Sequence, residues 1–413
     1  MNNAVIKRLW KELSAELVIY LLFCGAFFAM PLGTSPCTIM GILIILVWLL
    51  SGAPIRSRRE CLRAPWFWPL VAVVVLVWVG LLWSPDARGL GIKYAGKTYY
   101  WVYACALASI PFFRYPAGRL IKAFLCGLLL NSLVALLQVA NIVPTMGAWG
   151  KRFYTGFNSG YNTLAILLIL GMLVASFYLG HAQGKKGKIL YGALLVVYFG
   201  NLIMLEGRGG YATFLVLSPI IFINIFRGKK VVYIILSYLV VIAIMCTSPV
   251  VRYRIGFTIN AVKEHMQTAK EYKTGKKWSE SDHVERVYMW RWAADLFREN
   301  PLLGVGTGGY SKSIIMEGGD REIAHPHNNI LYILASYGIL GILIYGWFFW
   351  VVIKWGWNYR QNPVGFFVLA SCLVILVGGM TDTHLLDAGG AFLLAVTTGL
   401  ISALPGREGP VVL

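Results

Sequence analysis

The apolar residues of this chain occur in long continuous runs rather than in alternation with polar residues. A helix needs about 20 apolar residues to cross the hydrocarbon core of a bilayer, and twelve runs approach that length. Because the runs lack a period of two, they predict helices and not barrel strands. The pattern therefore predicts an all-α integral membrane protein. The expected spans lie near 17–32, 37–53, 66–83, 98–113, 120–140, 161–180, 189–205, 211–226, 231–248, 329–353, 363–381 and 389–404.

The spans divide the chain into three parts. Residues 1–248 hold nine spans, residues 249–328 form one long hydrophilic segment, and residues 329–413 hold three spans and a tail. The first span follows a basic start but lacks an Ala-x-Ala-like cleavage pattern. We therefore expect it to be retained rather than removed as a signal peptide.

The long hydrophilic segment is expected to be ordered and partly helical. Ser281 or Asp282 can cap a helix that ends before Asn300 and Pro301, and another helix is expected over 255–272. An apolar face on the first of these helices is expected to lie on the membrane or on the bundle. Its residues are Val287, Trp290, Ala294 and Phe297.

The glycines that follow, Gly304, Gly306, Gly308 and Gly309, predict a flexible turn. As a phosphate-binding loop they are a weak match, because no Lys-Ser or Lys-Thr comes after them. A nucleotide-binding site is therefore not expected here.

Basic residues predict the orientation. With the amino terminus inside, 19 of the 37 Lys and Arg residues lie in inner segments, against six in short outer segments. The other twelve lie in the long segment, which can be translocated whatever its charge. This asymmetry places both termini in the cytoplasm and the long segment outside. The net charge of +19 is then mostly an inner-leaflet anchor and no sign of nucleic-acid binding.

Composition agrees with a membrane protein: 58 % of the residues are hydrophobic, 14 % are aromatic and the mean hydropathy is +0.67. The seven cysteines lie in or beside the spans and include no CxxC pair. An odd count with none in the long segment argues against a disulfide-stapled outer domain.

Residues 324–341 read AHPHNNILYILASYGILG. The spacing of His327 and Asn328, then Gly338, then Gly341 resembles the signature of the bacterial O-antigen ligase and polymerase superfamily. Three further features agree with this resemblance: Arg208 and Gly209 at an outer span end, the ERVYMWRWA helix followed by PLLGVGTGGY, and one large loop before the motif. Length and the single loop are more similar to O-antigen ligases than to the larger pilin-directed enzymes.

The resemblance implies a fold like that of GT-C glycosyltransferases. It also implies transfer of O-antigen from undecaprenyl diphosphate to a lipid A-core sugar, at the periplasmic face of the bacterial inner membrane. No cofactor is expected, because the glycosyl diphosphate already carries a good leaving group. An O-antigen polymerase or a protein O-oligosaccharyltransferase would use the same donor. A transporter is a second alternative, since twelve spans are common in carriers, but charges inside the spans are sparse.

Transfer requires a base for the attacking hydroxyl and cations for the departing diphosphate. His327 suits the first task because an imidazole accepts a proton near neutral pH. Arginine suits the second, since its planar fork matches phosphate oxygens. The family pattern implies Arg208 and Arg286 for this role, with Arg291 as a further candidate. The alternatives are structural: Arg208 could reach the membrane interface, and Arg286 and Arg291 could pair with Asp282 and Asp295.

Other residues are expected to bind substrate. They include His325 and Asn328 next to His327, and Gly209 next to Arg208. A second outer cluster holds Asp382, His384 and Asp387 and either lines the acceptor path or caps helices. An outer loop with Lys151, Arg152, Tyr154 and Asn158 either receives acidic core sugars or is an ordinary solvated loop. His325 and His327 could ligate a metal, but without a third ligand in register we expect no metal site.

Overall fold

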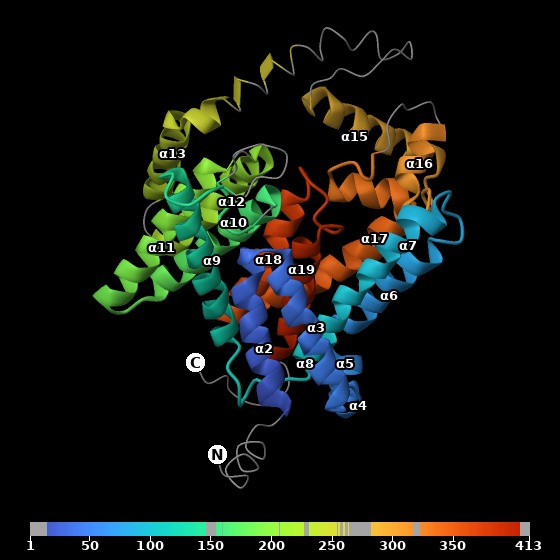
Figure 1. The fold of residues 1–413 in the computed structure, drawn as a ribbon, viewed down its shortest axis with the longest axis horizontal. Coiled ribbons are helices and arrows are strands. Elements are labelled where there is room, and N and C mark those ends of the chain that lie inside the picture. The colour runs from blue at the N-terminus through green and yellow to red at the C-terminus, as the bar shows by residue number, and fades with distance from the viewer. Residues whose placement is uncertain are drawn as a thin grey trace.

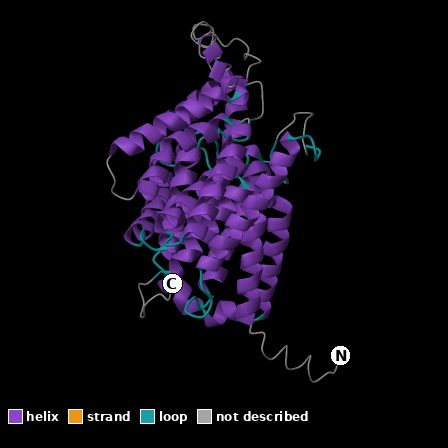
Figure 2. Cartoon of the chain, turned by 90° about the vertical axis from the view of Figure 1, so that its left-hand side faces the viewer, coloured by secondary structure: helices purple, strands orange, loops and turns teal. Residues whose placement is uncertain are grey.

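The structure of the protein is a computed structural model, which describes residues 15–145, 154–158, 160–205, 207–226, 231–253, 255–256, 259–260, 263, 282–316 and 323–404. All regular secondary structure in these residues is helical (Figures 1 and 2). The elements are α2 (Ala15–Ala29), η1 (Met30–Leu32), α3 (Thr34–Leu50), α4 (Ala53–Arg56), α5 (Arg58–Arg63), α6 (Phe67–Val79), η2 (Ala87–Gly91), α7 (Ile92–Gly96), η3 (Lys97–Trp101), α8 (Val102–Ala108), α9 (Gly118–Val139), α10 (Tyr161–His181), α11 (Lys185–Met204), α12 (Arg208–Phe226), α13 (Val231–Thr247), α15 (Asp282–Glu299), α16 (Gly309–Met316), α17 (Asn329–Asn358), α18 (Pro363–Gly378), α19 (Ala388–Leu400) and η5 (Ile401–Ala403).

The predicted all-α membrane fold is confirmed in its coarse form. Six helices in the described residues are long and apolar enough to cross a membrane, and five shorter apolar helices coincide with further predicted spans. The expected span at 98–113 is not one helix, because η3 and α8 divide it and helical structure ends at Ala108. The count of twelve spans therefore stays a prediction.

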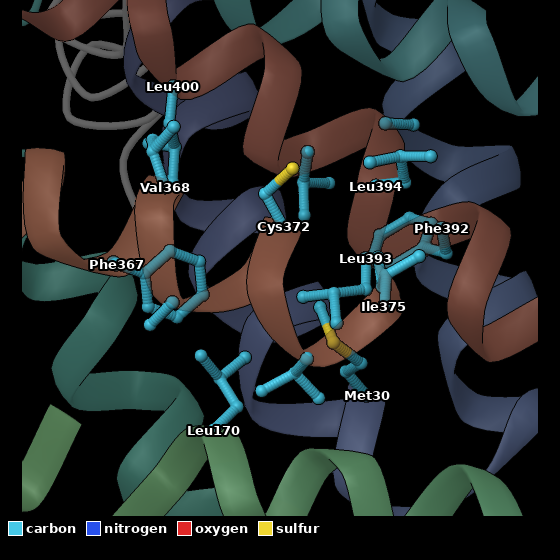
Figure 3. Close-up of a cluster of buried hydrophobic side chains, with 14 of the residues drawn as sticks. Met30, Leu170, Phe367, Val368, Cys372, Ile375, Phe392, Leu393, Leu394 and Leu400 are labelled. Atoms are coloured by element: carbon cyan, nitrogen blue, oxygen red, sulfur yellow. The ribbon is translucent and has the colours of Figure 1, made fainter. Parts of the chain in front are cut away.

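The centre of the bundle is formed by α10, α18 and α19. Helix α10 packs against α9, α11, α12 and α18, while α19 packs against α8 and α18. Figure 3 shows side chains that fill this centre, among them Leu170 of α10, Phe367 of α18 and Phe392 of α19. Cys372 lies fully buried among them and acts as a small core residue. All seven cysteines are free.

The two ends of the bundle differ. The first and last described residues lie at one end, where the Tyr20 hydroxyl donates to the Pro116 carbonyl at 3.0 Å and Trp66 Nε1 donates to Ser402 at 3.3 Å. We call this the terminal end; it also carries the basic helix α5. The opposite end, which we call the site end, carries α15 and α16 (Figure 1). The starts of α10, α12, α17 and α19 lie there as well.

The helix predicted before Asn300 is confirmed as α15, but its buried face is not the predicted one. Met289, Ala293 and Leu296 are buried and form a small separate core with Tyr310 and Ala335. The predicted face, Val287, Trp290, Ala294 and Phe297, is only half-buried. The facing helices α16 and α17 decide which side of α15 packs, and the expected contact of the apolar stripe with the membrane or the bundle stays a prediction. Most of the helix expected over 255–272 lies outside the described residues.

The glycine-rich segment before α16 is a packed structure and not the flexible turn that the sequence predicted. Gly304, Gly306 and Gly308 adopt positive φ angles of 61°, 83° and 76°, which glycine accepts without steric cost. The amides of Val305 and Gly306 donate to the carbonyls of Ala335 and Ser336, each at 2.9 Å. Backbone hydrogen bonds therefore attach this segment to α17.

Helix α17 is broken at the point where this segment attaches. Gly338 has φ 61° and ψ −151°, which interrupts the helical hydrogen bonding. The amides of Ile339 and Leu340 donate instead to the carbonyls of Pro301 and Leu302, at 2.8 and 3.2 Å. The break thus has a protein partner for its freed backbone groups, as a broken helix in a membrane requires. The Gly338 of the sequence motif is therefore explained by backbone geometry.

Candidate active site

His327 lies in the short loop that leads into α17. Its φ of 48° places it in the left-handed region, which is unusual for a residue with a side chain. Asn328 holds the loop: its Oδ1 caps α17 by accepting from the amides of Ile330 and Leu331, and its Nδ2 donates to the Met380 carbonyl at 2.9 Å. Asn328 therefore positions the neighbouring histidine by joining two helix ends, and this contact was not part of its predicted substrate-binding role.

The imidazole of His327 pairs with Asp382. His327 Nδ1 lies 2.8 Å from Asp382 Oδ1, which also accepts from the Thr383 amide at 2.8 Å. The other carboxylate oxygen accepts from Asn162 Nδ2. Because Asp382 Oδ1 can only accept when the carboxylate is ionised, Nδ1 carries the proton and Nε2 of a neutral His327 is left with a lone pair.

The surroundings of Asp382 favour its charged form. Burial alone raises the pKa of this carboxyl, but the hydrogen bond and charge attraction from His327 outweigh it and hold the pKa well below its usual value. The carboxylate also holds the imidazole ring of His327 in one orientation. The sequence placed Asp382 in a separate outer cluster. Its pairing with His327 arises because the ends of α17 and α18 meet at the site end.

Arg208 begins α12 next to this pair. A Cβ at Gly209 would lie 2.3 Å from Thr381 Oγ1, and one at Gly207 would lie 3.4 Å from Asn162 Oδ1. The backbone on both sides of Arg208 thus touches the residues that surround Asp382. Gly209 is required for close packing against Thr381. Its predicted role in substrate binding stays a prediction.

Helix α15 reaches the same loop through a tryptophan. Trp290 Nε1 donates to the Pro326 carbonyl at 3.0 Å, one residue before His327. Arg286 lies one helical turn earlier on the same face of α15, so it is directed toward the same side. Arg291 is adjacent and half-buried. Asp295, its suggested partner, pairs with Arg298 at 2.6 Å, while the side chain of Asp282 lies outside the described residues.

His325 and Lys97 complete the surroundings of His327. The rings of His325 and His327 meet edge to face, with 4.5 Å between centroids. Burial and the neighbouring His327 lower the pKa of His325 to about 4, so it is neutral at pH 7. Lys97 donates to the Leu386 carbonyl, and burial lowers the pKa of its ammonium. In the sequence Lys97 is only one of the basic residues of the short outer segments, and tertiary structure alone brings it to His325.

The remaining members of the second outer cluster lie beside the His327–Asp382 pair. His384 is only 3 % exposed, and its Nδ1 lies 3.8 Å from Asp387 Oδ2, so its imidazole packs against the carboxylate on the buried side. Asp387 Oδ2 accepts from the Thr163 hydroxyl. Burial raises the pKa of Asp387, but His384 and Thr163 together lower it below its usual value. Asp387 is therefore ionised at neutral pH.

The outer loop before α10 is only partly described. Lys151 and Arg152 lie outside the described residues. Tyr154 accepts at its carbonyl from Asn201 at 3.2 Å, and Asn158 is buried and donates to the Pro31 carbonyl at 3.2 Å. Both of the described residues fasten the loop to the bundle, which is a structural role.

One group of side chains has the composition of a metal site. Ligand atoms of His325, His327 and Asp382 all lie within 4.8 Å of one another. The sequence-based argument against a metal assumed that no third ligand was in register, and Asp382 shows that this assumption was wrong. In the structure, however, the carboxylate and Nδ1 of His327 are hydrogen-bonded to each other. A metal ion at this place would have to replace that bond.

Comparison with known proteins agrees with the geometry. Residues 192–346 match the family model described as O-Antigen ligase. A search of curated proteins found no match. The matched segment contains Arg208, Arg286, Arg291 and His327, whereas Asp382 lies beyond it. By this match the segment 192–346 is similar to the O-antigen ligase/polymerase superfamily, and the chain is a multi-pass membrane protein.

Proposed function

We propose that the protein transfers O-antigen glycan from undecaprenyl diphosphate to a sugar hydroxyl of lipid A-core, at the periplasmic face of the inner membrane. The pairing of His327 with Asp382 beside Arg208 is the observation that carries the proposal. It combines a proton acceptor and a cation at the site end, where two membrane-anchored amphiphiles would meet at headgroup depth. The family match supports the same class of reaction.

In the proposed reaction, His327 Nε2 accepts the proton of the acceptor hydroxyl as its oxygen attacks the anomeric carbon of the donor. The bond between that carbon and the diphosphate oxygen breaks, and undecaprenyl diphosphate leaves. Asp382 stabilises the imidazolium that forms. Arg208 and Arg286, with Arg291 as a further contact, stabilise the charge on the diphosphate through charge-assisted hydrogen bonds.

The choice of acceptor is the decisive experiment. Purified protein in lipid nanodiscs receives the lipid-linked glycan together with lipid A-core, or receives additional lipid-linked glycan alone. We expect consumption of donor only with lipid A-core, and loss of that consumption in His327→Ala. Elongation of the lipid-linked glycan without lipid A-core would identify a polymerase instead, and consumption that is equal in His327→Ala would exclude the role of His327.

The proposed reaction needs no metal, because arginines already supply the positive charge. We therefore expect EDTA to leave the initial transfer rate unchanged. A loss of rate that one divalent ion restores would instead assign His325, His327 and Asp382 as metal ligands.

A further inference from the structure

A cavity lies at the site end, beside the helix turn that contacts the His327–Asp382 pair. Its volume is about 190 Å³, far more than the roughly 30 Å³ that one water molecule occupies in the liquid. It lies between the start of α3, the η3–α8 segment, the loop before α10 and the start of α19. Residues lining it include Thr34, Thr38, Tyr103, Asn158, Asp387 and Phe392.

One wall of this cavity is fixed by buried hydrogen bonds. Asn131 Nδ2 donates to the Thr155 carbonyl at 3.0 Å, and the Phe157 amide donates to Asn131 Oδ1 at 2.9 Å. Gln138 accepts from the Gly156 amide at 2.9 Å. The loop that carries Asn158 is therefore held in place, and the cavity is a preformed feature of the bundle.

The first turn of α10 connects the cavity to the reacting groups. Asn162 donates to Asp382, the partner of His327, while the next residue, Thr163, donates to Asp387 in the cavity wall. Two consecutive residues thus contact the two carboxylates. The cavity wall at Asp387 is thus joined through the first turn of α10 to Asp382, the partner of His327.

The cavity and Arg208 lie on opposite sides of α10. Tyr161 and Ala165 face the glycines on either side of Arg208. At about 100° per residue, Thr163 is turned roughly 180° away from them, with Asn162 in between. In a direct displacement at an anomeric carbon, the nucleophile approaches the ring from the face opposite the leaving group. The arginines suit the leaving diphosphate, so the cavity is on the side from which the acceptor would approach.

The chemistry of the lining suits an uncharged sugar. Among the described residues that line it, Asp387 is the single charged group. A diphosphate would be repelled by this carboxylate, whereas sugar hydroxyls can donate to it. Threonine hydroxyls and the Asn158 side chain add polar contacts, and Tyr100, Tyr103 and Phe392 offer aromatic surface to the apolar faces of a sugar ring.

We propose that this cavity binds an uncharged sugar ring of the acceptor glycan, and that Asp387 accepts hydrogen bonds from its hydroxyls. The proposal rests on the transfer reaction proposed above and adds to it the place of the acceptor. Binding here holds the reacting hydroxyl near His327 while the diphosphate stays on the arginine side.

Filling the cavity tests the proposal kinetically. Thr38→Trp places an indole in the cavity, whereas Ile39→Trp adds the same side chain at a neighbouring position that is 57 % exposed and outside the cavity. We expect Thr38→Trp to raise the KM for lipid A-core by about tenfold or more, equal to about 1.4 kcal/mol of binding, with the donor KM unchanged. Ile39→Trp should leave both values at those of the wild type.

A binding measurement without turnover complements the kinetics. Thr34→Cys provides a thiol in the cavity wall, and Ser35→Cys provides one just outside it. Labelling by a small uncharged thiol reagent is measured at each position by peptide mass spectrometry. Lipid A-core should slow labelling of Thr34→Cys and not of Ser35→Cys, and undecaprenyl diphosphate should affect neither.

The outcomes separate the two proposals. If wild-type protein transfers glycan to lipid A-core and Thr38→Trp keeps a normal acceptor KM, the cavity assignment is wrong and the transfer function stands. If lipid A-core protects Thr34→Cys although no transfer occurs, the function is wrong and the assignment stands. Protection by undecaprenyl diphosphate alone would overturn the assignment in favour of a site for the lipid chain.

Discussion

At the scale of single residues, the site depends on the groups that orient His327. The positive φ of this residue is maintained by Asn328, which caps α17 and binds the turn after α18. Asp382 fixes the ring through Nδ1. A histidine held in this way has one free nitrogen in a defined position, as a general base requires.

Removal of the Asp382 charge tests this orientation. Asp382→Asn keeps the size of the side chain but removes the charge that stabilises an imidazolium. We expect the transfer rate at saturating substrates to fall by about a hundredfold or more, within the usual range for general-base catalysis. Asp295→Asn removes an exposed carboxylate of α15 and should retain the wild-type rate. A rate for Asp382→Asn within twofold of the wild type would contradict the role of the pair.

The charge geometry of Arg208 can be tested separately. Arg208→Lys keeps the positive charge and loses the planar fork that binds two phosphate oxygens together. We expect it to be nearly as inactive as Arg208→Ala, with protein yield unchanged in both variants. Initial rates of glycan transfer measure this. Near-normal activity of the lysine variant would show that Arg208 contributes only a positive charge and that its planar fork is not needed.

The half-buried His325 predicts a dependence of stability on pH. Its pKa is about 4 in the folded protein and near 6.5 in an unfolded chain, so the unfolded state binds more protons between these values. Thermal stability should therefore be constant above about pH 7 and fall as the pH decreases toward 4. The lowered pKa of Asp382 changes the free energy of unfolding only at pH values below about 4. In His325→Gln, melting temperatures measured between pH 7 and 5 should fall less steeply than in the wild type.

At the scale of elements, the broken helix α17 joins the loop to the bundle. A Cβ at Gly338 would lie 2.5 Å from the backbone of Leu302, and its φ of 61° is strained for any other residue. Gly346, farther along the same helix, has open space at the corresponding position. Substitution of Gly346 is therefore a control for substitution of Gly338.

Gly338→Ala should lower the free energy of unfolding by about 3 kcal/mol, through steric overlap and backbone strain. Gly346→Ala should leave stability unchanged or raise it slightly, because alanine favours helix. Thermal unfolding in detergent compares the two variants. Equal melting temperatures would show that the break does not depend on glycine.

The elements also show which structural features a sequence can predict. Eleven of the twelve spans predicted from continuous apolar runs coincide with apolar helices of the described residues, because burial in lipid leaves a strong one-dimensional pattern. The buried face of α15 and the packing of Gly304 were not predicted, since both depend on α17, which is distant in sequence. The same holds for the site. His327 and Arg208 were predicted from their motifs, whereas the contacts of Asp382, Asn162 and Lys97 arise only where helix ends meet.

At the scale of the whole molecule, the two ends of the bundle have different chemistry. The terminal end carries the basic residues of α5, and the site end carries the His327–Asp382 pair. In a bacterial inner membrane, the excess of Lys and Arg at the terminal end favours a cytoplasmic location for it. The proposed orientation of the site toward the periplasm follows from this distribution.

Thiol labelling in spheroplasts tests the orientation. Lys93 is exposed at the site end and Arg58 is exposed at the terminal end. A membrane-impermeant maleimide should modify Lys93→Cys in intact spheroplasts and should modify Arg58→Cys only after permeabilisation. The reverse pattern would place the reacting groups in the cytoplasm, where lipid A-core and donor would not meet after export.

After Gly338, the amides of α17 donate to residues 301 and 302 and not within the helix, which affects how the helix is assembled. Residues 301–306 complete the backbone hydrogen bonding of a helix that follows them in the chain, so that helix is fully paired only when they are already in place beside it. The segment before α16 is thus not an independent part that could be deleted or exchanged as a unit. A chimaera joined between these two stretches would insert a helix with unpaired amides into hydrocarbon and would be recognised by quality-control proteases.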